Sequence, residues 1–292
     1  MRSRSTWRFV PLVGTLLLVA AACSKSTTGA AASGTPPTSA SMTASEMPSG
    51  AMPSGEMPLQ PGAANMKVKV NGLSPGFVLK SNVLSVPVST SGYDDSCSTA
   101  GKPVTQGQGH YHVLLDGALI NMFCGPVAKV SMQNVSPGKH MVEVVPAQND
   151  HAEIMGNAVE VPFTYKPSKP LAEITASSAT GDPGIQILEP QDGATLSGDF
   201  TVKVAFSNFS ASCGLMGKPA VPGYGHWHIN IDSMTGPPMG MGTMLGMSCT
   251  ATFHGSTQGL DAGSTHTLYA LLTDNGHAPL NVSDSIQFTV GS

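Results

Sequence analysis

Two stretches of the sequence repeat one pattern of chemically active residues, GHYHVLLD from residue 109 and GHWHINID from residue 225. Each stretch places two histidines two positions apart and an aspartate four positions after the second histidine. On a strand, this spacing turns both imidazoles to one face, where they can bind Cu(II), Zn(II) or Ni(II). The pattern therefore predicts paired metal ligands that face solvent or a covering loop, with Asp116 and Asp232 fixing their tautomers.

Two further histidines accompany each pair at matching distances. We expect two four-histidine metal sites, formed by His110, His112, His140 and His151, and by His226, His228, His266 and His277. In the structural alternative, the same histidines hydrogen-bond loop backbone or carboxylates such as Asp150 and hold no ion. A third interpretation is that they bind an organic or carbohydrate ligand.

Methionines close to the second histidine pair favour copper among the possible metals. Thioether sulfur prefers Cu(I). The candidate thioether ligands are Met234, Met239, Met241, Met244 and Met247. Copper is thus the first choice of metal and zinc the alternative, although methionine is also a general filler of gaps and of low-complexity sequence.

The chain contains two copies of one unit. Cys97 and Cys213, the first histidines of the two pairs, and the two aspartates are each separated by 116 positions. Later pairs such as Cys124 and Cys249 are separated by 125 or 126 positions because the second copy carries an insertion. Each copy therefore holds one cysteine before its histidine pair and one after it. This arrangement predicts disulfides between Cys97 and Cys124 and between Cys213 and Cys249.

Short β-rich runs such as VLSVPVS, HMVEVVP, FTVKVAF and HTLYALL recur between glycine, proline and asparagine turns. Only 11% of residues are charged, against roughly 25% in ordinary soluble domains. Evenly spaced strands in units of this size predict an all-β chain of two tandem immunoglobulin-like Greek-key sandwiches, each with one disulfide. We place the sandwiches at residues 66–166 and 185–292, joined by a linker at 167–184.

The N-terminus carries a secretory signal. Arginines precede an apolar run that ends in Ala-Ala-Ala-Cys23 and is too short to span a membrane. This ending resembles a bacterial lipobox, so residues 1–22 are predicted as a lipoprotein signal peptide and Cys23 as the lipidated residue. Residues 23–65, rich in Met, Pro, Ser and Gly, are predicted as a disordered tether. We expect an extracytoplasmic protein anchored by lipid to a bacterial membrane.

The histidine motifs, with the later S-P-G-K-H or A-G-S-T-H and N-D-H or N-G-H, resemble a family of uncharacterised bacterial envelope domains. The typical motif of that family is G-H-H-H-L-L-I-D, and here Tyr111 and Trp227 replace its middle histidine. The resemblance covers about the last two thirds of each copy. It implies an extracytoplasmic module present twice, and it supplies neither a ligand nor an activity.

Composition narrows the remaining function classes. A net charge of −4 provides no basic surface for nucleic acid. The chain lacks the Ser-elbow, zinc-protease and phosphate-loop motifs of common enzymes, which favours a non-catalytic, monomeric binding protein. The rival is an interaction module for protein or glycan at the cell envelope, in which the histidines are structural. A copper-dependent redox enzyme is the third hypothesis, and the sequence leaves any protein partner unidentified.

Overall fold

A computed structural model describes residues 57–235 and 241–292, which lie within one compact unit. The predicted signal peptide, Cys23 and most of the predicted tether lie outside the described residues, as does Met239. Within the described residues the regular structure is β-strand, with three short 3-10 turns at Ala63–Asn65, Met155–Asn157 and Met241–Thr243. None of the helices found there is long and apolar enough to span a membrane.

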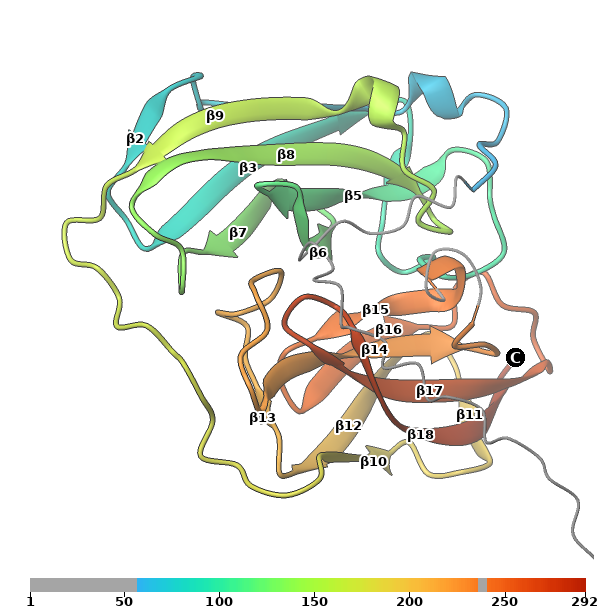
Figure 1. Ribbon diagram of the computed structural model, residues 1–292. Helices are drawn as coiled ribbons and strands as arrows, with labels where there is room; N and C mark the ends of the chain where they lie inside the picture. Colours follow the sequence, from blue (N-terminus) through green and yellow to red (C-terminus); the bar gives the residue numbers. More distant parts are fainter. Residues whose placement is uncertain (1–56, 236–240) are drawn as a thin grey trace, which may run out of the picture. The chain divides into compact units, whose positions relative to one another are not determined.

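The first copy folds into two facing sheets, drawn from blue to yellow-green in Figure 1. One sheet has the order β1 (Lys67–Val70), β3 (Val83–Ser91) and β7 (Val127–Ser131). The other has the order β2 (Phe77–Leu79), β9 (Val159–Tyr165), β8 (Gly138–Gln148), β5 (Gln108–Leu115) and β4 (Asp94–Asp95), with β6 (Ala118–Phe123) also paired to β5. The chain crosses repeatedly between the sheets, which is the Greek-key connection of an immunoglobulin-like sandwich.

The second copy repeats this topology strand for strand, drawn from yellow to red (Figure 1). Its smaller sheet has the order β10 (Gly184–Glu189), β12 (Asp199–Ser207) and β16 (Thr252–Ser256). Its larger sheet has the order β11 (Ala194–Leu196), β18 (Pro279–Val290), β17 (Thr265–Asp274), β14 (Tyr224–Ile231) and β13 (Ser210–Ala211), with β15 (Met244–Ser248) also paired to β14. The predicted fold class is confirmed.

Alternation along β5 and β14 builds the two cores. Tyr111 and Val113 point into the first sandwich and are fully buried, and Trp227 and Ile229 do the same in the second. A large aromatic at this strand position is a hallmark of immunoglobulin-like cores. Apolar burial of this kind is the main force that stabilises each sandwich.

Both predicted disulfides are present and lie at the same end of each sandwich. Cys97 pairs with Cys124, and Cys213 pairs with Cys249. Each bond ties the loop before the histidine strand to the end of the strand that follows it. Two disulfides of this kind fit an oxidising compartment outside the cytoplasm.

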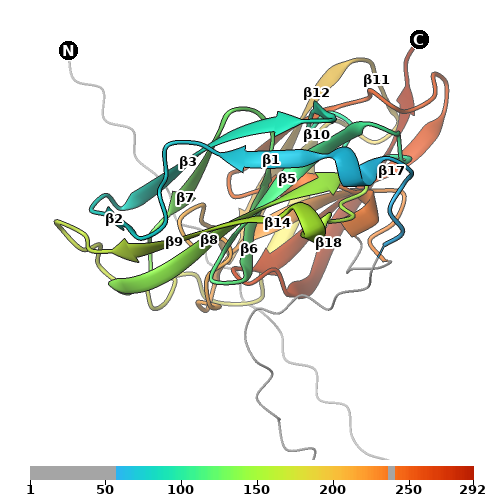
Figure 2. The same ribbon diagram turned by 90° about the horizontal axis from the view of Figure 1, so that it is seen from above.

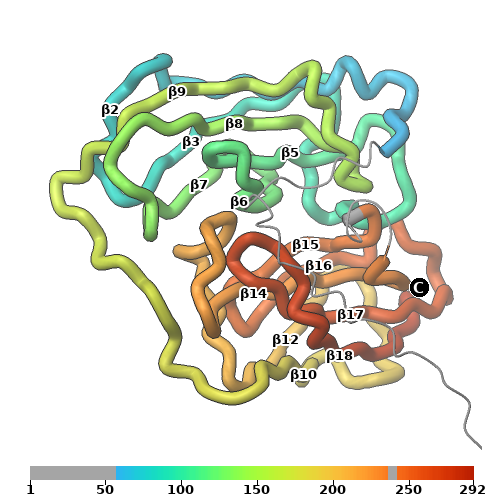
Figure 3. Tube along the Cα trace, viewed as in Figure 1, coloured from blue at the N-terminus to red at the C-terminus, as the bar shows by residue number. Residues whose placement is uncertain are grey.

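The segments that flank the first sandwich also contact it. The backbone N–H of Gln60 donates to Gln148 Oε1 at 2.6 Å, and Ala63 is buried, so contacts begin before Met66, where we placed the boundary. In the linker, the backbone of Ile174 exchanges two hydrogen bonds with the Asn134 side chain. The segment is the yellow stretch that joins β9 to β10 in the chain trace of Figure 3.

The outward faces of β5 and β14 differ from expectation. His110, His112 and His226 have no exposed surface, and His228 keeps 8%. These faces are covered by contacts between the two sandwiches and not by solvent or a loop alone. Lys102 of the first copy, for example, donates to the carbonyl of Ser256 in the second at 2.6 Å. Figure 2 shows β5, β8 and β9 of the first large sheet and β14, β17 and β18 of the second from above.

Candidate metal centre

The glycine before each histidine pair is required by close backbone packing. A Cβ at Gly109 would stand 2.2 Å from the Ala147 carbonyl oxygen, and one at Gly225 would stand 2.0 Å from that of Thr273. These carbonyls belong to β8 and β17, the antiparallel neighbours of the histidine strands. Glycine therefore lets the two strands approach, and this approach fixes where the following histidines project.

Three of the four predicted histidines converge in the first copy. His110 Nε2 lies 3.0 Å from His112 Nε2 and 3.1 Å from His151 Nδ1, and the last two atoms are 3.2 Å apart. Three nitrogens bound to one tetrahedral ion at about 2.0–2.1 Å would be spaced by about 3.3 Å. The geometry is within a few tenths of an ångström of a metal site, and we call these three residues triad 1.

The second copy reproduces this arrangement. His226 Nε2 lies 3.1 Å from His228 Nε2 and 2.9 Å from His277 Nδ1, and the last two atoms are 3.3 Å apart. We call these residues triad 2. In both triads every ring is buried, and each set of three could hold a metal ion.

The third histidine of each triad sits in a tight turn between the last two strands of its sandwich. His151 and His277 both have positive φ, of 68° and 71°, a conformation that few residues other than glycine and asparagine adopt readily. The turns are closed by backbone hydrogen bonds such as His151 N to the Gln148 carbonyl at 2.9 Å. This bend turns Nδ1 of each ring toward the histidine pair of its own copy.

Each third histidine is also held by the opposite sandwich. His151 Nε2 donates to the Met244 carbonyl of the second copy at 2.7 Å, and His277 Nε2 donates to the Leu119 carbonyl of the first at 2.8 Å. Leu119 and Met244 occupy equivalent positions at the start of β6 and β15. The two sandwiches thus complete each other's triads through a reciprocal pair of hydrogen bonds.

Hydrogen-bond partners assign the tautomers in triad 1. His151 carries its proton on Nε2, which donates to Met244, and His112 carries its proton on Nδ1, which donates to Glu153 Oε1 at 2.6 Å. The two lone pairs left, on His151 Nδ1 and His112 Nε2, face each other at 3.2 Å. His110 can donate a proton to only one of them, so the cluster has room and electrostatic need for a cation.

Burial keeps the imidazoles of His110, His151 and triad 2 neutral. Desolvation lowers the pKa of His110 well below its ordinary value, and the neighbouring histidines lower it further. The same cause lowers the pKa of His151 to about 3 and holds the pKa of His226, His228 and His277 below their usual range. Neutral rings keep their lone pairs, which is the state that a metal requires.

The predicted fourth histidine of each site does not lie in its triad. His140 Nδ1 pairs with Asp116 Oδ2 at 2.7 Å, and its Nε2 donates to the Ser136 carbonyl at 2.9 Å, so both nitrogens are engaged outside triad 1. His266 likewise pairs with Asp232 at 2.7 Å. The two aspartates therefore orient these histidines and not the triads. For this pair of residues in each copy, the structural interpretation holds.

The predicted methionine ligands differ in their burial. Met244 and Met247 are buried between the sandwiches, and Met234 lies in the partly exposed loop after β14. Sequence reasoning missed Met122 and Met216, which belong to the same six-residue apolar cluster as Met244 and Met247. The missed signal is the repeat itself, since Met122 and Met247 are equivalent positions, paired in register with His112 and His228.

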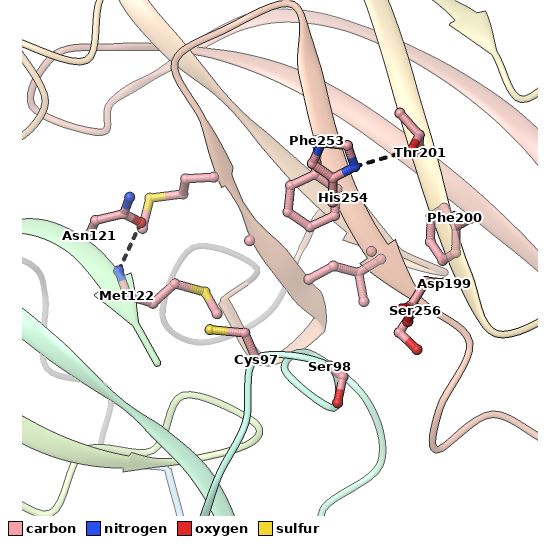
Figure 4. A pocket seen from close by; sticks show the side chains of 14 residues that line it. Cys97, Ser98, Asn121, Met122, Asp199, Phe200, Thr201, Phe253, His254 and Ser256 are labelled. Carbon is pink, nitrogen blue, oxygen red and sulfur yellow. Dashed lines mark hydrogen bonds between the residues drawn. The ribbon is translucent and has the colours of Figure 1, made fainter. Parts of the chain in front are cut away.

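A cavity of about 620 Å³ opens beside this methionine cluster (Figure 4). Met122 and Met247 line it together with Phe253 and His254 of the second copy. In Figure 4 the side chains of Met122 and Cys97 point toward one another, and His254 is held by Thr201 through a hydrogen bond of 3.1 Å. The cavity therefore places open space beside two methionines that pair in strand register with His112 and His228.

Comparison with known proteins finds similarity only to solved structures. No protein-family model matches the chain, and no curated protein matches it. Among solved structures, fibronectin(III)-like modules of Clostridium thermocellum CbhA match at 13% identity over 77% of this chain and 94% of that chain, with a TM-score of 0.24. A Bacteroides ovatus mixed-linkage glucan utilisation protein, SGBP-B, matches at 8% identity over 76% of this chain and 47% of that chain, with a TM-score of 0.23.

Likenesses at this level carry no argument about binding or activity. The chain also spans less than half of the second of these structures. The strands, sheets and disulfides by themselves define a tandem immunoglobulin-like sandwich protein. Its distinguishing feature is a pair of buried histidine triads, each of which could hold a metal ion.

Proposed function

We propose that this chain is an extracytoplasmic protein that binds transition-metal ions, with copper favoured, at triads 1 and 2. The observation that carries the proposal is the convergence of three buried imidazole nitrogens within 3.0–3.2 Å in triad 1, where two assigned lone pairs face each other. A hydrogen-bonded structural cluster would place a donor against each acceptor. A metal ion would satisfy all three nitrogens at once.

Copper is favoured over zinc by the surroundings of the triads. Three neutral imidazoles suit either metal, but thioether sulfur is a soft ligand that prefers Cu(I). Four of the six residues in the cluster between the sandwiches are methionines, whereas the two sandwich cores together contain one, Met132. Met122 and Met247 stand in strand register with a histidine of each triad, so they are the thioethers placed to assist.

The proposed extracytoplasmic location rests on the two disulfides and on the N-terminal sequence. The two disulfides fit an oxidising compartment. Lipidation at Cys23 and a tether that holds the sandwiches away from the membrane remain part of the proposal, because both rest on the sequence alone. Such a protein would hold metal at the cell envelope without catalysis.

Calorimetric titration of the full chain with Cu(II) and Zn(II), and with Cu(I) under reducing conditions, tests the proposal. We expect each triad to bind one equivalent of at least one of these ions, with the equivalent at triad 1 lost in H110A/H112A and that at triad 2 lost in H226A/H228A. The matched control is H140A/H266A, which removes two histidines outside the triads and should keep both equivalents. Unchanged stoichiometry after removal of both triads would return the histidines to a structural role and leave the interaction-module hypothesis.

The choice of metal has its own control. M122L/M247L should weaken Cu(I) binding and leave Zn(II) binding unchanged, because leucine keeps the apolar volume but lacks sulfur. M132L, in the first sandwich core, should alter neither. Equal effects of M122L/M247L on both metals would remove the argument for copper and leave the triads without an assigned metal.

A further inference from the structure

The two triads differ in one charged group. In triad 1, the Glu153 carboxylate accepts a hydrogen bond from His112 Nδ1 at 2.6 Å. Glu153 follows His151 in the turn and is held opposite Ala147 by an isolated bridge. The carboxylate is about one third exposed, while the ring that it contacts is buried. Triad 1 is thus a histidine cluster with a negative charge attached to one ligand.

Triad 2 has proline at the matching place. Pro279 is paired with Thr273, the register equivalent of Ala147 with Glu153. Of the residues that the structure describes, no aspartate or glutamate forms an ion pair with any histidine of triad 2. The nearby Asp274 instead accepts from the backbone N–H of Ala278 at 2.9 Å.

The other charges around triad 2 do not replace that carboxylate. His277 lines a cavity of about 360 Å³ that is also lined by Lys218, Asp116 and His140. Asp116 is paired with His140 at 2.7 Å, and Lys218 adds a buried positive charge on the same side. A cation bound at triad 2 therefore meets neutral ligands that bond to no carboxylate of the described residues, with a neighbouring ammonium group and the Asp274 carboxylate near His277.

The effect of the Glu153 carboxylate on ion binding depends on the charge of the bound ion. The cost of burying an ion rises with the square of its charge, so a dication needs compensation far more than a monovalent ion does. A carboxylate bonded to a ligand histidine supplies that compensation and raises the basicity of the imidazole. The two triads also lie at one contact between the sandwiches, since His151 of triad 1 donates to the Met244 carbonyl of the second copy and His277 of triad 2 donates to the Leu119 carbonyl of the first. Filling both with dications is therefore doubly disfavoured.

We propose that the two triads select ions of different charge, with Glu153 as the specificity-determining residue. Triad 1 takes a divalent ion, and triad 2 takes a monovalent one, for which Cu(I) is the chemical class. This assignment rests on the proposed metal-binding function. It makes the duplicated sandwiches two different sites and not two copies of one site.

Zn(II) is the probe that tests the assignment on the full chain, because it is divalent and does not change oxidation state. We expect one tight Zn(II) equivalent in the wild-type protein, lost in H110A/H112A and kept in H226A/H228A. E153Q keeps the shape of the side chain and removes its charge, and should weaken that Zn(II) equivalent by about 10- to 100-fold. Cu(I) binding at triad 2 should be unaffected by E153Q.

The reciprocal variant is P279E, which places a carboxylate at the matching position of the second copy. It should create a second tight Zn(II) equivalent, and H226A/H228A should abolish that gain. Circular dichroism of each variant checks that the sandwiches remain folded, and E153Q provides the test if P279E does not fold. Two equal Zn(II) sites in the wild type, or no change with E153Q, would overturn the assignment, whereas no metal binding at all would defeat the proposed function itself.

Discussion

The loops that precede the two histidine strands share the motif Cys-x-x-x-Gly-Lys-Pro but differ in how their lysines are held. Lys102 Nζ in the first copy donates to three carbonyls, those of Ser98, Ser256 at 2.6 Å and Gln258 at 2.7 Å. Lys218 Nζ, its equivalent in the second copy, is buried without a hydrogen-bond partner in the part of the chain that the structure describes. One fold therefore satisfies a buried ammonium group in one copy and not in the other.

The asparagine behind each loop shows the same difference. The Asn149 side chain donates to the carbonyls of Thr99, Lys102 and Pro103 at 3.0–3.2 Å and accepts from the backbone of Thr105 at 3.0 Å. Neither polar atom of the Asn275 side chain has a partner within the described residues. Anchoring of the loop by the asparagine side chain is thus a property of the first copy alone, whereas the backbone carbonyl of the asparagine accepts from the loop in both copies, from Gly101 N at 2.7 Å and from Gly217 N at 2.8 Å.

Close packing between the sandwiches is what the two loops have in common. A Cβ at Gly101 would stand 2.4 Å from the Met244 carbonyl oxygen, and one at Gly217 would stand 2.3 Å from that of Leu119. These are the same carbonyls that accept hydrogen bonds from His151 and His277. The comparison teaches that each loop serves the triad of its own copy by pressing on the opposite sandwich, whether or not its polar groups are satisfied.

The largest expected difference between the copies is in the free energy of unfolding lost when Asn149 or Asn275 is replaced. Asn149→Ala removes four hydrogen bonds and leaves their buried backbone partners unpaired, so the free energy of unfolding should fall by about 3 kcal/mol. Asn275→Ala removes an amide without partners and should change it by less than about 1 kcal/mol. Urea unfolding followed by circular dichroism measures both. Equal losses would mean that Asn275 is hydrogen-bonded in solution and that the copies do not differ.

Substitution of Gly101 and Gly217 tests the close packing against the opposite sandwich that both copies share. Gly101→Ala and Gly217→Ala should each cost about 2 kcal/mol and displace the carbonyl that holds a triad histidine, so metal affinity should fall as well. Gly107→Ala is the matched control, because Gly107 has a similar positive φ, 76° against 70° for Gly101, but nothing within 4 Å of its Cβ position. Calorimetric metal titration separates the effects. Equal loss of affinity in all three variants would assign it to backbone strain and not to contact between sandwiches.

The sequence predicts the fold and the disulfides because both depend on local pattern and on the repeat. Alternation on β5 and β14 separates core residues from histidines, and the matching positions select His151 and His277. The pattern cannot separate His140 from the ligands, because its position at a strand start does not reveal that Asp116 and Ser136 engage both its nitrogens.

Other features of the site arise only when the two copies meet. No periodicity indicates that the histidine faces of the copies are buried between them, or that Leu119 and Met244 supply crossed carbonyls. Glu153 could have been suspected from its position two residues after His151. Its contact with His112, however, depends on the turn that holds His151 at positive φ. Long-range packing therefore determines the chemistry of sites whose ligands the sequence shows in part.

Substitution of the two loop lysines should change the free energy of unfolding least, and the change at Lys218 should depend on pH. Lys218→Met replaces a buried, unpartnered ammonium group with an apolar side chain of similar length, and should raise the free energy of unfolding by about 1–2 kcal/mol at pH 7. Lys102→Met should lower it, because three carbonyls lose their donor. Urea unfolding at pH 7 compares the two, and stabilisation by both variants would show that the carbonyls around Lys102 do not compensate its burial.

Burial lowers the pKa of Lys218 to about 8, and the negative charge of Asp116 offsets part of this decrease. Between pH 8 and the ordinary lysine value near 10.5, the unfolded chain keeps a proton that the folded chain has lost, so wild-type stability from this group rises with pH. Lys218→Met lacks this gain. Its advantage over the wild type should therefore shrink by about 1.5 kcal/mol between pH 8 and 9.5. An advantage that stays constant over this range would mean that Lys218 finds a partner that keeps it charged, and the contrast between the two loops would then be lost.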